Sequence, residues 1–206
     1  MSSTTGEASL SVRAARRGDA PEVAALLYES AAARYDQFAG DRGRARVLLE
    51  RSFRRRGNTA SCETISVVEL EGRVAGVLAA FPSAEGDRRA RRFLRMALVG
   101  MAPWRWAEAL QIFRLGTDAV PPPPADALYV DALATSAALR RRGAGRALLA
   151  EAERRARDAG LVAVALDTGE RNAPARALYE RSGFVVSARR DADGAMPGLV
   201  AYVKRL

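Results

Sequence analysis

A run of arginine and glycine residues near the middle of the chain has the composition of an anion-binding turn. It reads Arg140-Arg141-Arg142-Gly143-Ala144-Gly145-Arg146 and stands between an apolar strand pattern, 128–135, and a helical pattern. The first amides of a helix have no intrahelical acceptor, and the helix dipole favours an anion there. Glycines lack a Cβ atom and let a ligand approach the backbone closely. The turn predicts a phosphate site, although a tight turn with solvated arginines explains the same residues.

A second polar motif follows a second apolar strand pattern, 161–167. It consists of Asn172, Ala175, Tyr179 and the pair Gly183-Phe184. Asn172 and Tyr179 are seven residues apart, which is two helical turns, so both side chains are expected on one face of a helix. An amide and a phenol on one face can point toward the same place. The structural alternatives are a helix N-cap for Asn172 and a core position for Tyr179.

Together, these two motifs resemble the acetyl-CoA-binding core of the GNAT superfamily of N-acetyltransferases. The resemblance covers residues 128–184 closely, with a strand before each motif and a helix between them. It implies an α/β fold, with a mixed, mostly antiparallel central sheet of about six to seven strands flanked by helices and with strands four and five splayed. It also implies an enzyme that moves an acetyl group from acetyl-CoA directly to a primary amine, without a covalent enzyme intermediate.

The resemblance implies a set of coenzyme-binding residues. The pyrophosphate would lie on the amides of residues 141–146, and the pantetheine arm would lie between the splayed strands. The residues implied are Leu133, Ala134, Thr135, Arg140, Arg141, Arg142, Gly143, Ala144, Gly145, Arg146, Asn172, Ala175 and Tyr179. The Leu133 amide would face the thioester oxygen, where it could stabilise negative charge. Arg176 is a further candidate for a ribose phosphate, although surface exposure is the simpler expectation.

The resemblance gives Tyr179 the role of general acid toward the departing thiolate. The general base is less clearly marked. Asp131 lies two residues before Leu133, which is the same face of a regular strand, in an area where many relatives carry a carboxylate. We take Asp131 as the candidate base, with Asp167 and Glu69 as alternatives. A polar side chain at a sheet opening explains Asp131 equally well.

Hydrophobic periodicity predicts the elements that position these residues. A strand near 9–15, a helix capped by Asp19, a helix near 44–56, a hairpin around Glu71-Gly72 and a closing hairpin after Phe184 complete the order. Residues 1–8 are expected to form a disordered lead, and residues 9–206 a single domain with its acetyl-CoA-binding core at about 128–184.

A helical insertion is predicted at about 86–118, broken at Pro103. In the family's minimal layout the chain passes almost directly from the third strand to the fourth at this point. Trp104 and Trp106 favour packing against the sheet, with an acceptor-pocket wall as the alternative. A membrane-surface helix is a third interpretation. The insertion could also shape the acyl end of the site for a longer acyl donor.

Composition excludes several kinds of chemistry. The 206 residues contain no histidine, so Ser-His-Asp and Cys-His catalysis and His-based metal sites are excluded, and no metal is expected. The single Cys62 cannot form an intrachain disulfide, and the opening residues do not have the pattern of a secretory signal. No run reaches the roughly 18 apolar residues of a membrane span. These features favour a cytoplasmic protein without membrane contact.

The net charge of +9, almost all of it from arginine, raises the question of an acidic partner. The basic residues are spread over the chain, so nucleic acid is not the expected partner, and a small-molecule or peptide amine is the expected acceptor. Either a monomer or a homodimer is compatible with the sequence. A different class of function is a catalytically inactive acyl-CoA sensor or a basic nucleic-acid-binding module on the same fold.

Overall fold

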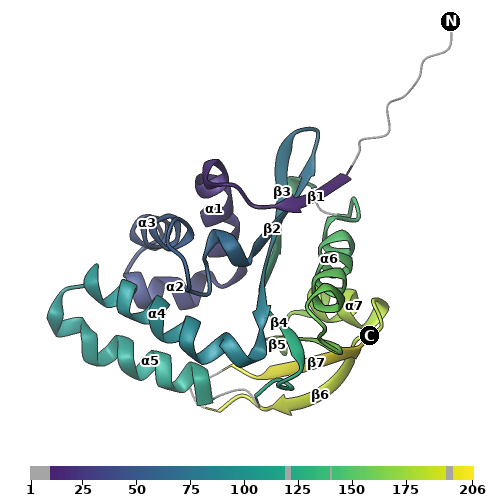
Figure 1. Ribbon diagram of the computed structural model, residues 1–206. Coiled ribbons are helices and arrows are strands. Elements are labelled where there is room, and N and C mark those ends of the chain that lie inside the picture. Colours follow the sequence, from purple (N-terminus) through teal and green to yellow (C-terminus); the bar gives the residue numbers. More distant parts are fainter. Residues whose placement is uncertain (1–9, 119–121, 140, 194–196) are drawn as a thin grey trace, which may run out of the picture.

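The computed structural model describes residues 10–118, 122–139, 141–193 and 197–206, which form one seven-stranded sheet between two layers of helices (Figure 1). The strands are β1 Leu10–Ala14, β2 Ile65–Leu70, β3 Arg73–Pro82, β4 Ala127–Thr135, β5 Ala163–Gly169, β6 Val185–Arg190 and β7 Leu199–Arg205. The helices are α1 Ala20–Ser30, α2 Ala32–Ala39, α3 Arg42–Phe53, α4 Gly86–Val99, α5 Trp106–Asp118, α6 Ala144–Asp158 and α7 Ala173–Arg181. The expected disordered lead and Arg140 lie outside the described residues.

The sheet has the strand order β1-β2-β3-β4-β5-β7-β6. All neighbouring strands are antiparallel except β4 and β5, which are parallel. The parallel pairing joins Ala127–Val130 to Ala163–Leu166 and stops there, while both strands continue beyond it. The predicted α/β fold, its mixed and mostly antiparallel sheet and its splayed fourth and fifth strands are therefore confirmed.

Helices α6 and α7 cover one face of the sheet (Figure 1). Small and branched apolar residues at helical spacing give α6 its buried stripe, which includes Ala144, Leu148, Ala152 and Ala156. These side chains pack with β3, β4, β5 and β7 in one continuous core. The coenzyme-binding segment predicted from the sequence therefore lies on a closely packed support.

Helices α1 and α3 cover the opposite face with a second core. Val23 and Leu27 of α1 and Leu49 and Phe53 of α3 are fully buried against β2 and β3. Full burial of such a side chain stabilises the fold by roughly 1.5–3 kcal/mol relative to exposure. This layer fixes α1 over β4 and so positions the far side of the splayed strands.

The first helical region differs from the prediction of a single helix capped by Asp19. The backbone leaves helical geometry at Ala31, with φ −152° and ψ 46°, so α1 and α2 are separate. Asp19 occupies the N-cap position, but its carboxylate accepts hydrogen bonds from the Arg13 side chain and the Arg16 amide instead of a helix amide. The capping prediction is wrong because a guanidinium competes successfully for the same oxygens.

The segment that the sequence analysis treats as an insertion contains two helices, α4 and α5, and they are separated at Pro103–Arg105 as predicted. We call this segment the insertion. The prediction that its tryptophans pack against the sheet is wrong, since Trp104 is 83% exposed and Trp106 is 43% exposed. The Trp106 indole N–H donates to the Leu98 carbonyl within the insertion itself. Among the described residues, only a small apolar cluster around Leu94 and Ala109 is buried between the two helices.

Candidate active site

Strands β4 and β5 separate immediately after the pair formed by Val130 and Leu166. The next residue on each strand is an aspartate: Asp131, which is exposed, on β4 and Asp167, which is half-buried, on β5. Beyond them, β4 pairs with β3 alone and β5 with β7 alone. We call this point the fork. Two carboxylates therefore stand where the gap between the strands begins.

A β-bulge at the fork changes the direction of the β4 side chains. Ala132 pairs with Ala79 and Val130 with Ala80, so Asp131 is the additional residue of the bulge. As a result, Val130 and Leu133 pack into the same core although they are three residues apart. The argument that placed Asp131 on the face of Leu133 assumed regular alternation, and the bulge makes it invalid.

The backbone of β4 beyond the fork presents peptide groups to the gap. The Ser136 amide donates to Ala75 of β3 at 2.8 Å, and in an antiparallel pair every second residue bonds to the same neighbour. The peptide groups of Ala134 therefore face β3, and those of Leu133 and Thr135 face the gap. The Ala134 carbonyl lies 2.8 Å from the place of a Cβ on Gly76, which agrees with this assignment. Ala134 thus offers no backbone group to a ligand in the gap.

The start of α6 offers unpaired amides. Gly143 is the N-cap residue with φ 84°, a left-handed conformation that glycine adopts without strain. No acceptor in the described part of the chain binds the amides of Ala144, Gly145 or Arg146, whereas the next amide bonds to the Gly143 carbonyl at 2.9 Å. Partial positive charge at a helix start makes these amides suitable for an anion.

The side chains around this turn have other contacts. Arg141, Arg142 and Arg146 are exposed, and Arg142 lies 3.8 Å from the Glu71 carboxylate of the β2–β3 turn. A Cβ on Gly145 would lie 2.9 Å from the Leu178 side chain of α7. Gly145 therefore permits close packing of α6 on α7, a role that sequence reasoning did not assign.

Tyr179 of α7 is 6% exposed, and its ring contacts Tyr202 and Phe184 at centroid distances of 5.7 and 6.1 Å. Burial raises the pKa of Tyr179 to about 12, with smaller contributions from the Asp167 charge and from Tyr202. Its hydroxyl makes no hydrogen bond with any residue that the structure describes. The phenol is thus a core residue that keeps its proton at neutral pH.

Asn172 has the helix-capping role considered from the sequence. Its side-chain oxygen accepts from the Ala175 amide at 3.4 Å, and its amide group donates to the Thr168 hydroxyl at 3.1 Å. Asn172 is exposed, and Ala175 is half-buried and packs against the core beneath α6. These bonds hold the first turn of α7 against the end of β5.

Sequence reasoning missed Tyr129. Its hydroxyl donates a short hydrogen bond to the Asp167 carboxylate, which ties β4 to β5 at the fork. The Tyr129 ring also packs against Phe81 of β3, with 6.0 Å between the ring centroids. Only the strand register, which pairs Tyr129 with Ala165, brings these two side chains together.

A family model described as the acetyltransferase (GNAT) family matches residues 26–184. The chain belongs to this family. A solved N-acetyltransferase from Staphylococcus aureus Mu50 is 20% identical, with a TM-score of 0.69 over 94% of this chain and 100% of its own. An agmatine N-acetyltransferase mutant is 19% identical, with a TM-score of 0.61 over 96% of this chain and 99% of its own.

A polyamine N-acetyltransferase from Drosophila melanogaster is also 19% identical, with a TM-score of 0.57 over 96% of this chain and 100% of its own. At these identities, the solved structures establish the GNAT fold alone. A search of the curated proteins gives no match.

Two further candidates are not at the fork of this GNAT fold. Glu69 binds Arg13 at 2.6 Å on β2, which is separated from β4 by β3, so it is not placed to act as the base. Arg176 donates to the Tyr202 hydroxyl at 3.3 Å and to the Glu170 carbonyl at 3.1 Å. Its guanidinium is therefore bound to the protein and half-buried, in contrast to the exposure expected from the sequence.

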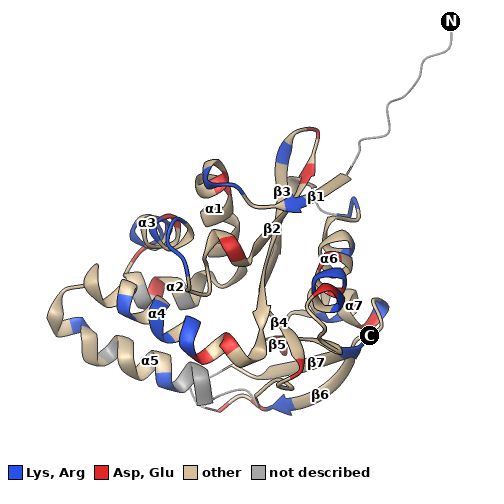
Figure 2. Cartoon of the chain, in the orientation of Figure 1, with Lys and Arg blue, Asp and Glu red and all other residues tan. Residues whose placement is uncertain are grey.

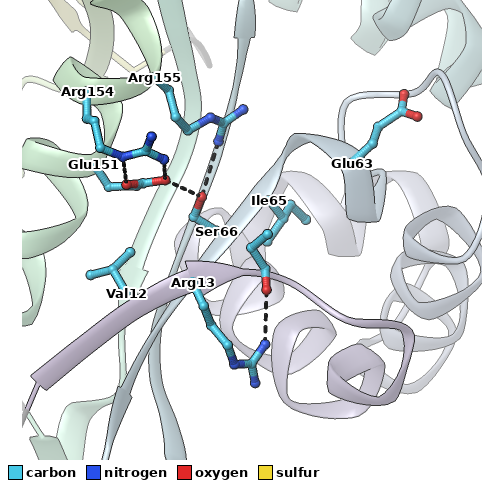
Figure 3. Close-up of a pocket in the computed structure, with 9 residues that line it drawn as sticks. Val12, Arg13, Glu63, Ile65, Ser66, Glu151, Arg154 and Arg155 are labelled. Atoms are coloured by element: carbon cyan, nitrogen blue, oxygen red, sulfur yellow. Dashed lines mark hydrogen bonds and ion pairs between the residues drawn. The ribbon is translucent and has the colours of Figure 1, made fainter. Parts of the chain in front are cut away.

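A polar pocket of about 360 Å³ lies elsewhere, between β1, β2 and α6 (Figure 3). Its charged groups are satisfied locally, since Arg154 binds Glu151 at 2.8 Å and Arg13 binds Asp19 at 2.7 Å. Arg155 donates to the backbone carbonyls of Thr64 and Ala80, and burial lowers its pKa. We interpret the residues that line this pocket as structural contacts that hold α6 against the edge of the sheet.

Metal and membrane features are also relevant to the class of the site. In the four described ranges, no cluster of three or more Cys, Asp or Glu side chains has the geometry of a metal site. None of the described helices has both the length and the hydropathy of a membrane span.

Proposed function

We propose that the protein is an acetyl-CoA-dependent N-acetyltransferase that moves the acetyl group directly to a primary amine. The observation that carries the proposal is the open fork, with one aspartate on each strand where the gap begins and with unpaired amides at the start of α6, the helix that follows β4. Membership of the acetyltransferase family supports the class of reaction. Acetyl-CoA would supply the thioester that the amine attacks.

The start of α6 and the free edge of β4 carry groups of the types that bind a coenzyme. The amides of Ala144, Gly145 and Arg146 can bind the pyrophosphate, and the exposed Arg141, Arg142 and Arg146 add positive charge around it. The peptide groups of Leu133 and Thr135 can bind the pantetheine arm as a neighbouring strand would. The Leu133 amide can then stabilise negative charge on the acetyl oxygen.

We assign the proton transfers to Tyr179 and Asp131. A phenol with a pKa of about 12 carries its proton at neutral pH and can donate a hydrogen bond to the departing thiolate. An amine must lose a proton to attack, and the exposed carboxylate of Asp131 can accept it directly or through water. The carboxylate of Asp167, held by Tyr129, can attract a positively charged acceptor.

A small cationic amine is the acceptor that this arrangement supports best. Two aspartates at the fork favour a substrate with positive charge beside the reacting nitrogen. Two proteins of similar fold are an agmatine and a polyamine N-acetyltransferase, which agrees with this class. We further propose that the protein acts in the cytoplasm, in line with its single cysteine.

Release of free thiol from acetyl-CoA in the presence of agmatine, spermidine or a lysine peptide tests the proposal. We expect turnover with at least one of these amines. Tyr179→Phe should lower kcat by about 10²-fold or more with little change in KM for acetyl-CoA, because the lost proton acts on the leaving group. Unchanged kcat would remove Tyr179 from the mechanism.

The two aspartates can be separated by the same assay. Asp131→Asn should lower kcat, because the proton acceptor is lost, and Asp167→Asn should mainly raise KM for the amine. The opposite pattern would exchange the two roles. Acetyl-CoA binding without transfer to any amine of a broad panel would instead favour a sensor, and salt-dependent retention on DNA would favour a nucleic-acid module.

A further inference from the structure

A second cavity, of about 570 Å³, lies between α3, the C-terminal end of α4 and the turn that leads to α5. It is separate from the fork and belongs to the insertion and the helices that it contacts. Figure 2 shows basic segments on α3 and along α4. The acetyl transfer proposed at the fork does not involve this cavity.

The lining of the cavity is strongly basic. Arg44 and Arg51 of α3 line it together with Arg105, and the described lining includes no carboxylate. Two of these guanidinium groups converge on Gly40, where nitrogen atoms of Arg105 and Arg44 lie 2.8 and 3.8 Å from the place of a Cβ. Arginines gathered at one surface repel one another, so a bound anion would be stabilised there.

Carboxylates compensate the charge of the two α3 arginines only weakly. Arg44 lies 3.4 Å from Asp41, but both side chains are largely exposed, and such pairs contribute little. Arg51 makes no ion pair with any residue in the described ranges. At least one lining guanidinium is therefore available to a ligand.

The cavity also has large apolar lining residues. Trp104 is 83% exposed and Val47 is 67% exposed, and Met96 and Met101 lie beside them. A surface on which several large apolar side chains are exposed together is often a binding site. Tryptophan offers a flat face for stacking, and methionine adapts to varied shapes.

We propose that this cavity binds an amphipathic organic anion, with a carboxylate, sulfonate or phosphate at one end of a flat apolar body. The acidic group would bind Arg44 and Arg51, and the body would lie against Trp104 and Met101. The cavity volume falls within the range of roughly 300–1,000 Å³ typical of small-molecule sites. The occupant is thus a small molecule of opposite charge, recognised independently of acetyl transfer.

Nuclear magnetic resonance of the full chain can test this site directly. The sequence contains two tryptophans, so two indole N–H signals are expected, and Trp104→Phe assigns them. The probes are 2-naphthalenesulfonate, its neutral analogue 2-naphthalenesulfonamide, and inorganic sulfate. We expect the sulfonate to shift the Trp104 signal and to bind about tenfold or more tightly than either other probe, because only it offers both charge and an apolar body.

Matched arginine variants locate the charge. Arg51→Gln should weaken sulfonate binding about tenfold, because it removes a charged hydrogen-bond donor from the cavity. Arg91→Gln, at a 63% exposed position of α4 outside the lining, should leave binding unchanged. Thermal unfolding confirms that both variants fold.

Three results would overturn the proposal. They are no shift of Trp104 at millimolar sulfonate, equal binding of the neutral analogue, and equal weakening by the two arginine variants. Because these readouts do not involve acetyl-CoA, they are independent of whether the fork transfers an acetyl group.

Discussion

The predicted coenzyme-binding core, residues 128–184, and the insertion are held to the rest of the protein by different kinds of contact. Helix α6 lies on the sheet through fully buried side chains such as Leu148 and Ala152. Helix α4 has few buried apolar residues and is tied down by Arg89, which binds Glu63 and Glu85 at 2.8 and 2.7 Å. The fork is thus built on a dense apolar core, and the insertion is attached largely by polar contacts.

The same polar anchor connects the insertion to the fork. Arg89 lies over the Phe81 ring, at 5.8 Å from its centroid, and Phe81 packs on Tyr129, which binds Asp167. Because polar anchors depend on a few specific atoms, single substitutions should loosen the insertion without unfolding the sheet. This difference gives three predictions.

The largest expected effect is in the α6 core. Leu148→Ala should destabilise the protein by about 3–5 kcal/mol, because a cavity forms in a core with no exposed edge. Leu94→Ala in the insertion should cost only about 1–2 kcal/mol, because its small cluster can collapse or admit water. Urea unfolding measures both, and equal losses would contradict the proposed difference.

The next effect concerns the anchor of α4. Arg89→Met should cost about 2 kcal/mol, because it removes the guanidinium that binds both the half-buried Glu85 and the Glu63 carboxylate. Arg88→Met is the matched control, because Arg88 is exposed and lies farther from the same Glu85, at 3.5 Å. This variant should change stability by less than about 0.5 kcal/mol. A similar loss in both variants would show that Arg89 is not the specific anchor.

The smallest expected effect concerns the decrease in stability at acidic pH. Hydrogen bonds from Arg13 lower the pKa of Asp19 and of Glu69 below their ordinary values. Their contribution is therefore fully present above the unfolded pKa values of about 4 and is lost as pH falls through the lower folded values. Arg13→Gln should flatten the decrease in stability below about pH 5. An unchanged pH profile would mean that these pairs do not contribute.

The coenzyme-binding core could be predicted from the sequence because its signals are local. Gly143 adopts the left-handed conformation that the turn requires, and Asn172 caps α7 within four residues. The break at Pro103 is equally local, since proline lacks an amide donor. Each of these features depends on the backbone of one short segment, and such features can be recognised without a fold.

The features that were missed depend on contacts between segments that are far apart in the sequence. The bulge at Asp131 arises from pairing with β3, 50 residues earlier, and the Tyr129–Asp167 bond from pairing with β5. Gly145 was assigned to ligand approach, and only the packing of α7 shows its contact with Leu178. Long-range contacts such as these leave no periodic pattern in the sequence.

Titration of the isotope-labelled protein with acetyl-CoA, followed through its backbone amide signals, tests the central claim most directly. We expect the largest changes at Leu133 and Thr135 of β4 and at Ala144, Gly145 and Arg146 of α6, because these groups face the gap or begin the helix. Changes confined to other parts of the sheet, or none at millimolar coenzyme, would contradict binding between the separated strands.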